Sequence, residues 1–415
     1  MIGGEIMEKG RVGMFMFYGD NLSNFPPVAN CARIWARNGF FVDIIMHPSG
    51  EAFSNYFKES NINIVTFSFP FKETAFLTHR NKYLSWAMRK IRYFFYIKNS
   101  LSYCKDKQYK YFIGFDPEGL IAATILSKLL KIKTPVVYHS LELLSLDTNS
   151  LRAKFNKYLE KRCNKRAIYT IIQDENRAEL LMKENEIRRE KILIVPNTNI
   201  GTLTNKIKDN DNHWRRRFGI EESKKIILYA GCLSQWAELE KLIKSIEFWP
   251  DDAVFLLHGW CSDDDYFELL RRTAEPYKDK VIFSSVGILP EDEYDHLVSS
   301  ASIGVAWYKK SILNIFHIGA SSGKVFQYLR CGVPVITNDL PDFKKLIEGN
   351  NCGICVSSER EIGEAIRKIL ADHEIYSQNA FKCFEKYEFS KSYQAVIDKL
   401  ETEKSKIVKG GTEDK

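Results

Sequence analysis

The chain has 415 residues, of which 45% are hydrophobic and 27% are charged, and its formal net charge is +7. At roughly 150 residues per domain this length predicts two or three domains. The apolar content excludes a disordered chain, and the 23 Gly and 12 Pro are too few for a collagen-like polymer.

The sequence carries two indications of its compartment. No run reaches 18 apolar residues, and the N-terminus lacks the apolar core and cleavage site of a signal peptide, so we expect a cytoplasmic protein. The nine Cys are scattered and odd in number, which favours reduced thiols. Cys352 and Cys355 form a CxxC without a second pair or a His at metal spacing, and we expect no zinc there.

The first half of the chain alternates apolar runs with helical patterns. The apolar runs predict strands at 11–18, 40–46, 61–69, 110–115, 134–140, 167–173 and 191–197. The helical patterns lie at 27–37, 80–104, 119–130, 151–167 and 175–186. This alternation is typical of a parallel sheet.

The polar residues 202–211 predict a linker, after which the alternation resumes. Strands are expected at 224–231, 253–259, 280–287, 302–308 and 333–337, and helices at 238–249, 266–276, 291–300 and 324–332. We therefore predict an α/β protein of two doubly wound parallel-sheet domains, 1–201 and 202–387, with a last helix at about 388–405 that returns to the first domain. Ligands of such sheets bind at the carboxyl ends of the strands, and two facing sheets offer a cleft.

Positive charge gathers in two helices of the first half. Residues 80–110 carry nine Lys and Arg against one Asp, and residues 151–167 carry seven against one Glu. Because aromatic residues are interleaved with the charges of 80–104, we expect this helix to lie on an anionic membrane surface. The alternatives are a core helix with a solvated basic face, and nucleic-acid binding, for which no module is recognisable.

Residues 321–336 (SSGKVFQYLRCGVPVI) carry the most specific signal. Small residues at the start of a helix leave backbone N–H groups open to an anion, which the helix dipole also favours. Lys324 lies in the first turn, where a positive charge opposes the dipole, and a bound diphosphate would explain it. The alternative is a solvated lysine beside ordinary helix caps.

This segment resembles a motif of GT-B glycosyltransferases, in particular of the large retaining, family four-like nucleotide-sugar group. Further resemblance lies in IGFDPEGL (113–120), VVYHSLEL (136–143), KILIVPNTNIG (191–201), ILYAGCLS (227–234), VGILPEDEYDHLVSSASIGV (286–305) and KYEFS (386–390). The resemblance implies a GT-B fold with two Rossmann-like domains. It also implies hexosyl transfer from a UDP- or GDP-sugar to a saccharide or lipid-linked acceptor, with retention, in cell-surface polysaccharide or glycoconjugate synthesis.

The same resemblance implies a donor site in the second domain. It places Gly231 and Cys232 near the diphosphate and Gly287, Ile288 and Leu289 around the base. It also places five residues on the phosphates or the sugar: Ser321, Ser322, Gly323, Lys324 and Gln327.

The chain departs from the family's pattern within this site. Gln327 stands where the family has a ribose-binding Glu, and Gly319 stands where it has another Glu. Trp236 and Glu238 replace common Arg and Lys residues, and either Lys309 or Lys310 is a candidate for the missing positive charge. The departures leave the identity of the donor open.

In the first domain, Asp116, His139 and Glu142 lie at or just past the ends of two predicted strands, where catalytic groups gather in open sheets. Asp116 and Glu142 are candidates to orient sugar or acceptor hydroxyls, and His139 is a candidate to bind the acceptor or the transferred sugar. The alternative for His139 is a buried histidine at a strand end. Gly19 and Asp20, after the first strand, are candidate acceptor-binding residues.

We expect neither a metal nor another cofactor. Asp263, Asp264 and Asp265 contain a DxD, which holds a divalent metal in other nucleotide-sugar enzymes, but their place before a helix favours an N-cap. Lys324 and the helix N-terminus would instead stabilise the leaving diphosphate. Two alternatives stay open: a catalytically degenerate GT-B subunit that binds a membrane or a partner glycosyltransferase, and a GT-B sugar epimerase. The oligomeric state is not predicted.

Overall fold

The structure is a computed structural model that describes residues 9–17, 22, 25–47, 57–67, 69, 82–131, 133–143, 151–208, 212–284, 286–287, 289–310 and 318–410. The chain folds into two compact units. Unit 1 comprises residues 1–195 and 390–415, and unit 2 comprises residues 196–389. The boundaries predicted from the sequence lie after residues 201 and 387.

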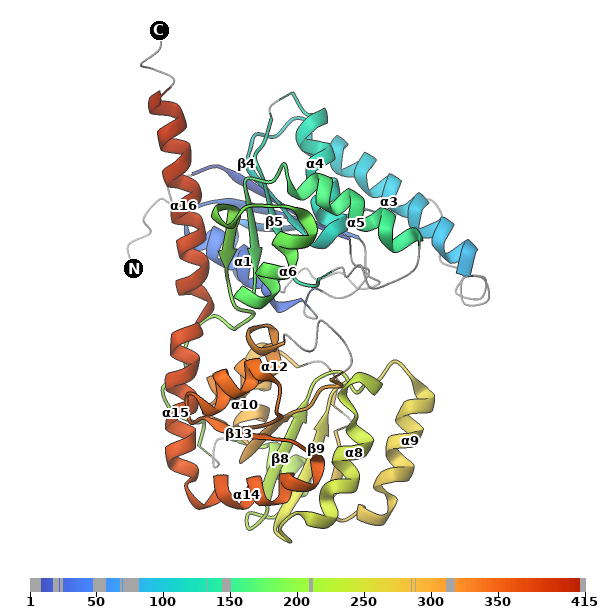
Figure 1. Cartoon of the computed structure of the whole chain (residues 1–415), viewed down its shortest axis with the longest axis vertical. Coiled ribbons are helices and arrows are strands. Elements are labelled where there is room, and N and C mark those ends of the chain that lie inside the picture. The colour runs from blue at the N-terminus through green and yellow to red at the C-terminus, as the bar shows by residue number, and fades with distance from the viewer. Residues whose placement is uncertain are drawn as a thin grey trace. The chain divides into compact units, whose positions relative to one another are not determined.

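Unit 1 is built on a seven-stranded parallel sheet with the order β3-β2-β1-β4-β5-β6-β7 (Figure 1). Its strands are β1 (Arg11–Met16), β2 (Phe41–Met46), β3 (Ile62–Thr66), β4 (Tyr109–Phe115), β5 (Val136–His139), β6 (Tyr169–Ile172) and β7 (Ile192–Ile194). Its helices are α1 (Pro26–Arg37), α3 (Lys82–Cys104), α4 (Asp116–Leu129), α5 (Leu151–Asn164), α6 (Glu175–Asn185) and α16 (Phe389–Gly410). Helices cover the sheet, so most strand residues are buried, which explains the near-continuous apolar runs of the sequence.

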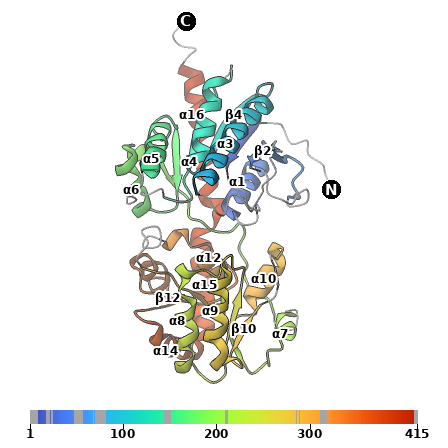
Figure 2. The same cartoon turned by 90° about the vertical axis from the view of Figure 1, so that its right-hand side faces the viewer.

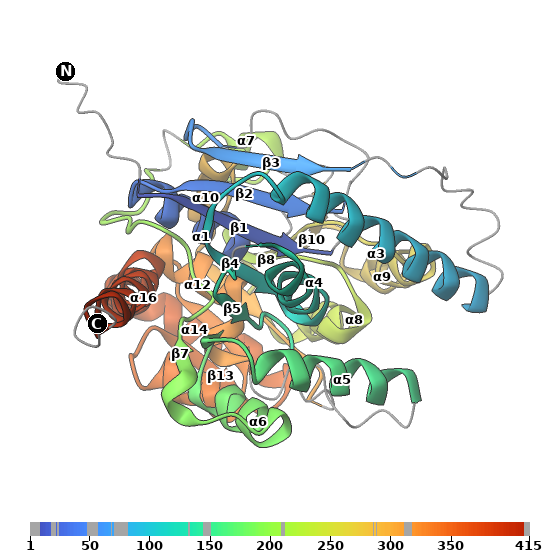
Figure 3. The same cartoon turned by 90° about the horizontal axis from the view of Figure 1, so that it is seen from above.

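Helix α4 lies between α3 and α5 (Figure 3) and approaches the sheet closely. A Cβ at Gly119 would lie 2.2 Å from the carbonyl oxygen of Phe15, and one at Gly114 would lie 2.4 Å from Cα of Leu120. Only glycine permits both contacts, because any side chain would push α4 off β1 and β4. The start of α4 is thereby fixed at the carboxyl end of β4.

Unit 2 is built on a six-stranded parallel sheet with the order β10-β9-β8-β11-β12-β13. Its strands are β8 (Lys225–Ala230), β9 (Ala253–His258), β10 (Val281–Phe283), β11 (Ile303–Ala306), β12 (Val335–Asn338) and β13 (Gly353–Val356). Its helices are α7 (Trp214–Arg217), α8 (Leu239–Lys244), α9 (Asp264–Ala274), α10 (Glu291–Ser299), α12 (Gly323–Arg330), α13 (Pro341–Phe343), α14 (Ile362–Ala371) and α15 (His373–Tyr387). Helix α12 packs against α15 (Figure 2).

Strand β13 and helices α14 and α15 are absent from the expected elements. The strand has four residues and pairs with β12 at the edge of the sheet, and so short an apolar run shows no period. It contains Cys355, whose Sγ lies 3.2 Å from Oγ1 of Thr337, while Cys352 is buried just before it. All nine cysteines are free, as the sequence predicts.

Helix α16 packs on α1 and β4 of unit 1. Trp35 Nε1 donates to the hydroxyl of Tyr393 at 3.2 Å, and Asn38 Nδ2 donates to Oε1 of Gln394 at 2.8 Å. Further along, the Tyr111 hydroxyl donates to the carbonyl oxygen of Leu400 at 3.0 Å. These bonds tie the last helix of the chain to its first helix and to the central strand.

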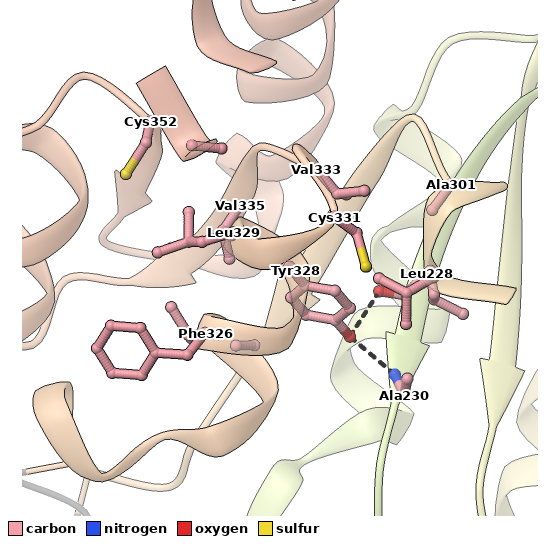
Figure 4. Packing of buried hydrophobic residues seen from close by; sticks show 14 of the residues in the cluster. Leu228, Ala230, Ala301, Phe326, Tyr328, Leu329, Cys331, Val333, Val335 and Cys352 are labelled. Carbon is pink, nitrogen blue, oxygen red and sulfur yellow. Dashed lines mark hydrogen bonds between the residues drawn. The ribbon is translucent and has the colours of Figure 1, made fainter. Parts of the chain in front are cut away.

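Tyr328 attaches α12 to the sheet of unit 2 (Figure 4). Its hydroxyl donates to the carbonyl oxygen of Leu228 at 3.1 Å and accepts from the backbone N–H of Ala230 at 2.8 Å. A Cβ at Gly304 would lie 2.4 Å from the ring, so β11 must have glycine there. Because Tyr328 is one turn beyond Lys324, these contacts set where α12 begins relative to the carboxyl end of β8.

Candidate functional site

Two glycine turns shape the carboxyl ends of β8 and β9. Gly231 has φ of 152° and Gly259 has φ of 149°, both in the region that favours glycine. The N–H of Gly231 donates to the carbonyl oxygen of His258 at 2.9 Å, and a Cβ at Gly259 would lie 1.8 Å from the oxygen of Gly231. The two turns are therefore pressed together at the edge where parallel sheets bind ligands.

Ser322 caps the N-terminus of α12 beside these turns. Its Oγ accepts from the N–H of Val325 at 3.4 Å and lies 2.6 Å from the hydroxyl of Tyr308. Asn197 holds the preceding loop, since its Nδ2 donates to the oxygen of Ser321 at 3.1 Å. At Gly323 a Cβ would meet only Nδ2 of Asn197, at 3.8 Å, so the first turn has little side-chain cover among the described residues.

Lys324 extends from this first turn toward Gly231. A Cβ at Gly231 would lie 3.1 Å from Cε and 3.3 Å from Nζ of Lys324, so the lysine passes over the bare backbone of the turn. Its Nζ is inaccessible to solvent and has no hydrogen-bond partner among the described residues. This burial lowers the pKa of Lys324 to about 7, because the charged ammonium is poorly solvated there.

Gln327 lies one turn below Lys324 and is engaged at both ends of its amide. Its Nε2 donates to Oδ1 of Asp295 at 2.6 Å, and its Oε1 accepts from Nδ2 of Asn199 at 2.8 Å. Asp295 in turn accepts two bonds of 2.7 Å from Nη1 of Arg330. A ribose hydroxyl would have to replace one of these bonds to reach Gln327, so its ribose role stays a prediction.

The predicted base-binding residues are only partly described, because Ile288 lies outside the described residues. Gly287 is exposed, and Leu289 packs against the core of unit 2. His258 ends β9 nearby, with Nδ1 at 3.0 Å from Oγ of Ser284. Burial lowers the pKa of His258 to about 4, so it is neutral at neutral pH.

Asp263 acts as a helix cap. Its Oδ1 accepts from the N–H of Tyr266 at 3.0 Å at the start of α9, and its Oδ2 accepts from Nε2 of Gln235 at 3.0 Å. The predicted N-cap is therefore confirmed. Within the described ranges, no group of three or more His, Cys, Asp and Glu could hold a metal ion.

Asp116 and Glu142 meet at a cavity of about 170 Å³ in unit 1. The cavity is lined from α3, α4 and α5 by residues that include Arg89, Lys90 and Glu118. Asp116 has φ of 52°, and its Oδ1 accepts from the N–H groups of Leu141 at 2.7 Å and Glu142 at 3.0 Å. The carboxylate therefore holds the loop after β5, and burial raises its pKa well above the usual value.

His139 lies apart from that cavity. It is 2% exposed, its Nδ1 is 3.6 Å from Sγ of Cys31, and its ring stacks with Tyr393 at 6.3 Å between centroids. Burial lowers the pKa of His139 to about 3. These contacts are those of a buried strand-end histidine, and a substrate would reach the ring only after a local rearrangement. Gly19 and Asp20 lie outside the described residues.

Several residues of the unit 2 site are not among those predicted from the sequence. Tyr229 and Tyr308, near the ends of β8 and β11, face Lys324, and Gly259 forms the second glycine turn. A Cβ at Gly319 would lie 2.6 Å from Cβ of Asp342, so this acidic residue lies beside the position where the family has a Glu. The sequence contained one indication of the second glycine turn at Gly259. The apolar run AVFLLHG ends in a glycine, as the preceding run does at YAG.

Two comparisons of the sequence bear on this site. Residues 210–382 match the model of a family described as Glycosyl transferases group 1. The chain is also 26% identical over 178 residues to the putative glycosyltransferase YtcC of Bacillus subtilis (strain 168). That match covers 40% of this chain and 41% of the relative, so the chain spans less than half the length of this relative. Both matches support a transferase.

Solved structures decide the fold. Anabaena HepE, in a structure with UDP and glucose, has a TM-score of 0.71 at 15% identity over 95% of this chain and 100% of HepE. WaaG, a glycosyltransferase involved in lipopolysaccharide biosynthesis, has a TM-score of 0.63 at 13% identity over 94% of this chain and 99% of WaaG. The fold is GT-B. The predicted fold class of two Rossmann-like parallel-sheet domains is confirmed. The segment 210–382 that matches the family model contains β8 to α14 together with Lys324.

Proposed function

We propose that the protein is a glycosyltransferase that moves a hexosyl group from a nucleotide-diphosphate sugar to a saccharide or lipid-linked acceptor. UDP-sugars are the first donors to test, because the HepE structures contain UDP, UDP with glucose, or UDP-glucose. Retention at the anomeric carbon is part of the proposal and follows from the resemblance to the retaining group.

One observation carries the proposal. At the N-terminus of α12, a lysine that has no hydrogen-bond partner in the described part of the chain lies over the glycine turn that ends β8, within the segment that matches group 1 glycosyl transferases. A helix N-terminus and an ammonium together favour a bound diphosphate. In catalysis the same groups would stabilise the charge that develops on the leaving nucleoside diphosphate. No step of this proposal requires a metal or another cofactor.

For the acceptor we propose the cavity that contains Asp116 and Glu142. Its carboxylates suit the hydroxyl groups of a saccharide, and its basic residues on α3 suit an anionic or lipid-linked acceptor. We further propose that α3 rests on an anionic membrane surface. No helix in the described ranges combines the length and apolar composition of a membrane span.

The experiment is a measurement of nucleotide release with UDP-glucose, UDP-galactose, GDP-mannose and ADP-glucose, each with and without a membrane lipid extract as acceptor. We expect one donor to be consumed only when the extract is present, and the labelled sugar to appear in the lipid fraction. Lys324→Ala should lower kcat/KM by about a hundredfold or more, because a charge contact to the leaving group is lost.

The matched control is Lys278→Ala, which removes an exposed lysine of unit 2 that lies outside the proposed donor site. We expect it to turn over like the wild type. Release of free nucleotide without sugar transfer would favour the epimerase. The absence of turnover with every donor would favour a degenerate subunit that binds a membrane or a partner.

A further inference from the structure

Three aromatic rings surround the ammonium of Lys324. Its Nζ lies 3.8 Å from the ring centroid of Tyr229, 5.2 Å from that of Trp236 and 5.2 Å from that of Tyr308. All three distances are within the range in which a cation is attracted to the face of a ring. The rings come from β8, from the loop after it and from the end of β11.

The rings are held in place by their own contacts. Trp236 and Tyr308 stack with centroids 5.6 Å apart and an angle of 12° between their planes. The Tyr308 hydroxyl pairs with Ser322, and the Tyr229 hydroxyl donates to the carbonyl oxygen of Cys232 at 2.9 Å. The carbonyl oxygen of Trp236 accepts from the N–H of Lys309 at 2.8 Å, which ties the loop after β8 to the end of β11.

No described carboxylate forms an ion pair with Lys324. Among the described residues, the titratable groups beside it are Tyr229, Tyr308 and the thiol of Cys232, and burial raises the pKa of all three, so they are neutral near pH 7. Within the described part of the chain, the three rings are therefore the groups that stabilise the ammonium. A diphosphate at the N-terminus of α12 would place next to it a full negative charge that no described residue supplies.

We propose that Trp236, with Tyr229 and Tyr308, forms an aromatic cage that positions Lys324 for the diphosphate of the donor. The proposal rests on the proposed function and adds a positioning residue to it. Trp236 occupies a position where the resemblance implies an Arg or a Lys. In place of a second positive charge, the cage favours diphosphate binding by holding Lys324 in one orientation. A lysine held in one rotamer loses less conformational entropy when the ligand binds.

The cage predicts that donor binding takes up a proton. The free lysine has a pKa of about 7, and a bound diphosphate raises this pKa because opposite charges favour the ammonium. Below the free pKa the lysine is already charged and affinity is constant. Above this pKa the free lysine is neutral and must take up a proton when the donor binds. Kd therefore rises by up to about tenfold per pH unit.

The test is calorimetric titration between about pH 6 and about pH 9 with UDP-glucose, or with GDP-mannose if only GDP-sugars turn over. The diphosphate of a nucleotide sugar does not titrate in this range. We expect the wild type to show the rise in Kd and proton uptake from the buffer. Trp236→Leu, which keeps an apolar side chain without a ring face, should weaken binding at low pH about threefold to tenfold. It should also move the onset of the rise to lower pH, because the ammonium loses one stabilising ring.

Further variants separate the possible outcomes. Trp236→Phe should restore the wild-type profile, and Lys324→Arg should bind without a pH dependence because its guanidinium stays charged. If Lys324→Ala abolishes binding but Trp236→Leu keeps the wild-type profile, the cage is wrong and the donor site stands. If Trp236→Leu changes Kd equally at every pH, the tryptophan is merely structural. If Lys324→Ala binds like the wild type, or the wild type binds neither sugar nucleotide, the donor site fails as well.

Discussion

At the scale of single residues, the phenol oxygen of Tyr328 has the clearest structural role. It accepts from the backbone of Ala230 and donates to that of Leu228 between α12 and β8. Tyr328→Phe removes the acceptor and leaves the buried N–H of Ala230 without it, which should destabilise unit 2 by about 1 to 3 kcal/mol. Urea unfolding followed by circular dichroism measures this loss. A change below about 0.5 kcal/mol would contradict the assigned role.

His139 gives a prediction about pH. Its pKa is lowered to about 3 in the folded state, against about 6.5 in an unfolded chain. As the pH falls, His139 is therefore protonated in the unfolded chain before it is protonated in the folded protein. The stability that the neutral ring contributes is lost as pH falls below about 6.5. At pH 5 the loss is about 2 kcal/mol.

The variant that tests this prediction is His139→Phe, which keeps a planar ring but cannot titrate. Between pH 8 and pH 5, the free energy of unfolding of this variant should fall by about 2 kcal/mol less than that of the wild type. Lys278→Ala, at an exposed position in unit 2, is the control. Equal acid sensitivity in wild type and His139→Phe would show that His139 is not buried as a neutral group.

The sequence predicted part of the candidate site. Lys324, Ser322 and Gly231 are close together, and the motif and the glycine turn had pointed to them. The aromatic cage was not predicted, because its rings come from separate elements. Tyr229 and Tyr308 lie in apolar runs, where an aromatic residue is indistinguishable from core, and Trp236 was noted only as the replacement of a cation. The hydrogen bonds of Gln327 with Asp295 and Asn199 likewise depend on side-chain positions, which the spacing of residues in the sequence does not predict.

At the scale of elements, apolar runs located most strands because both faces of the parallel sheets are covered. Strand β13 has four residues at a sheet edge, so neither length nor period distinguished it from a loop. Helix α9 was expected from 266 and begins at Asp264, since the capping Asp263 extends the helix toward the N-terminus. Caps thus decided boundaries that hydrophobic periodicity left uncertain.

Helix α3 is the element on which the proposed membrane binding depends. Exposed apolar residues on it (Trp86, Ile91 and Phe94) lie among the exposed basic residues Arg89, Lys90 and Lys98. Vesicles that contain anionic lipid should pellet the protein at low ionic strength and release it in high salt, because counterions screen the attraction. Lys90→Glu with Lys98→Glu should abolish pelleting.

The control for this experiment is Lys278→Glu, a charge reversal at an exposed position of unit 2. It should pellet like the wild type. Pelleting that is absent at low salt, or that persists equally in the α3 variant, would contradict a membrane role for α3.

At the scale of the whole molecule, each unit has its own buried core and its own parallel sheet. The GT-B fold by itself leaves the reaction open, because one fold hosts many functions. The chemistry depends on the groups at the carboxyl ends of the strands, and those of unit 2 are the better defined. The central claim is accordingly that the N-terminus of α12, with Lys324, binds a nucleoside diphosphate.

The most direct test of that claim is a thermal-shift panel of UDP, GDP, ADP, CMP and dTDP on the wild type and on Lys324→Ala. A ligand that binds only the folded state raises the apparent Tm by mass action, by about 3 °C or more at a large excess over Kd. We predict that one diphosphate raises the Tm of the wild type and that Lys324→Ala loses the shift. The absence of a shift with all five nucleotides, or an equal shift in Lys324→Ala, would contradict the proposed donor site.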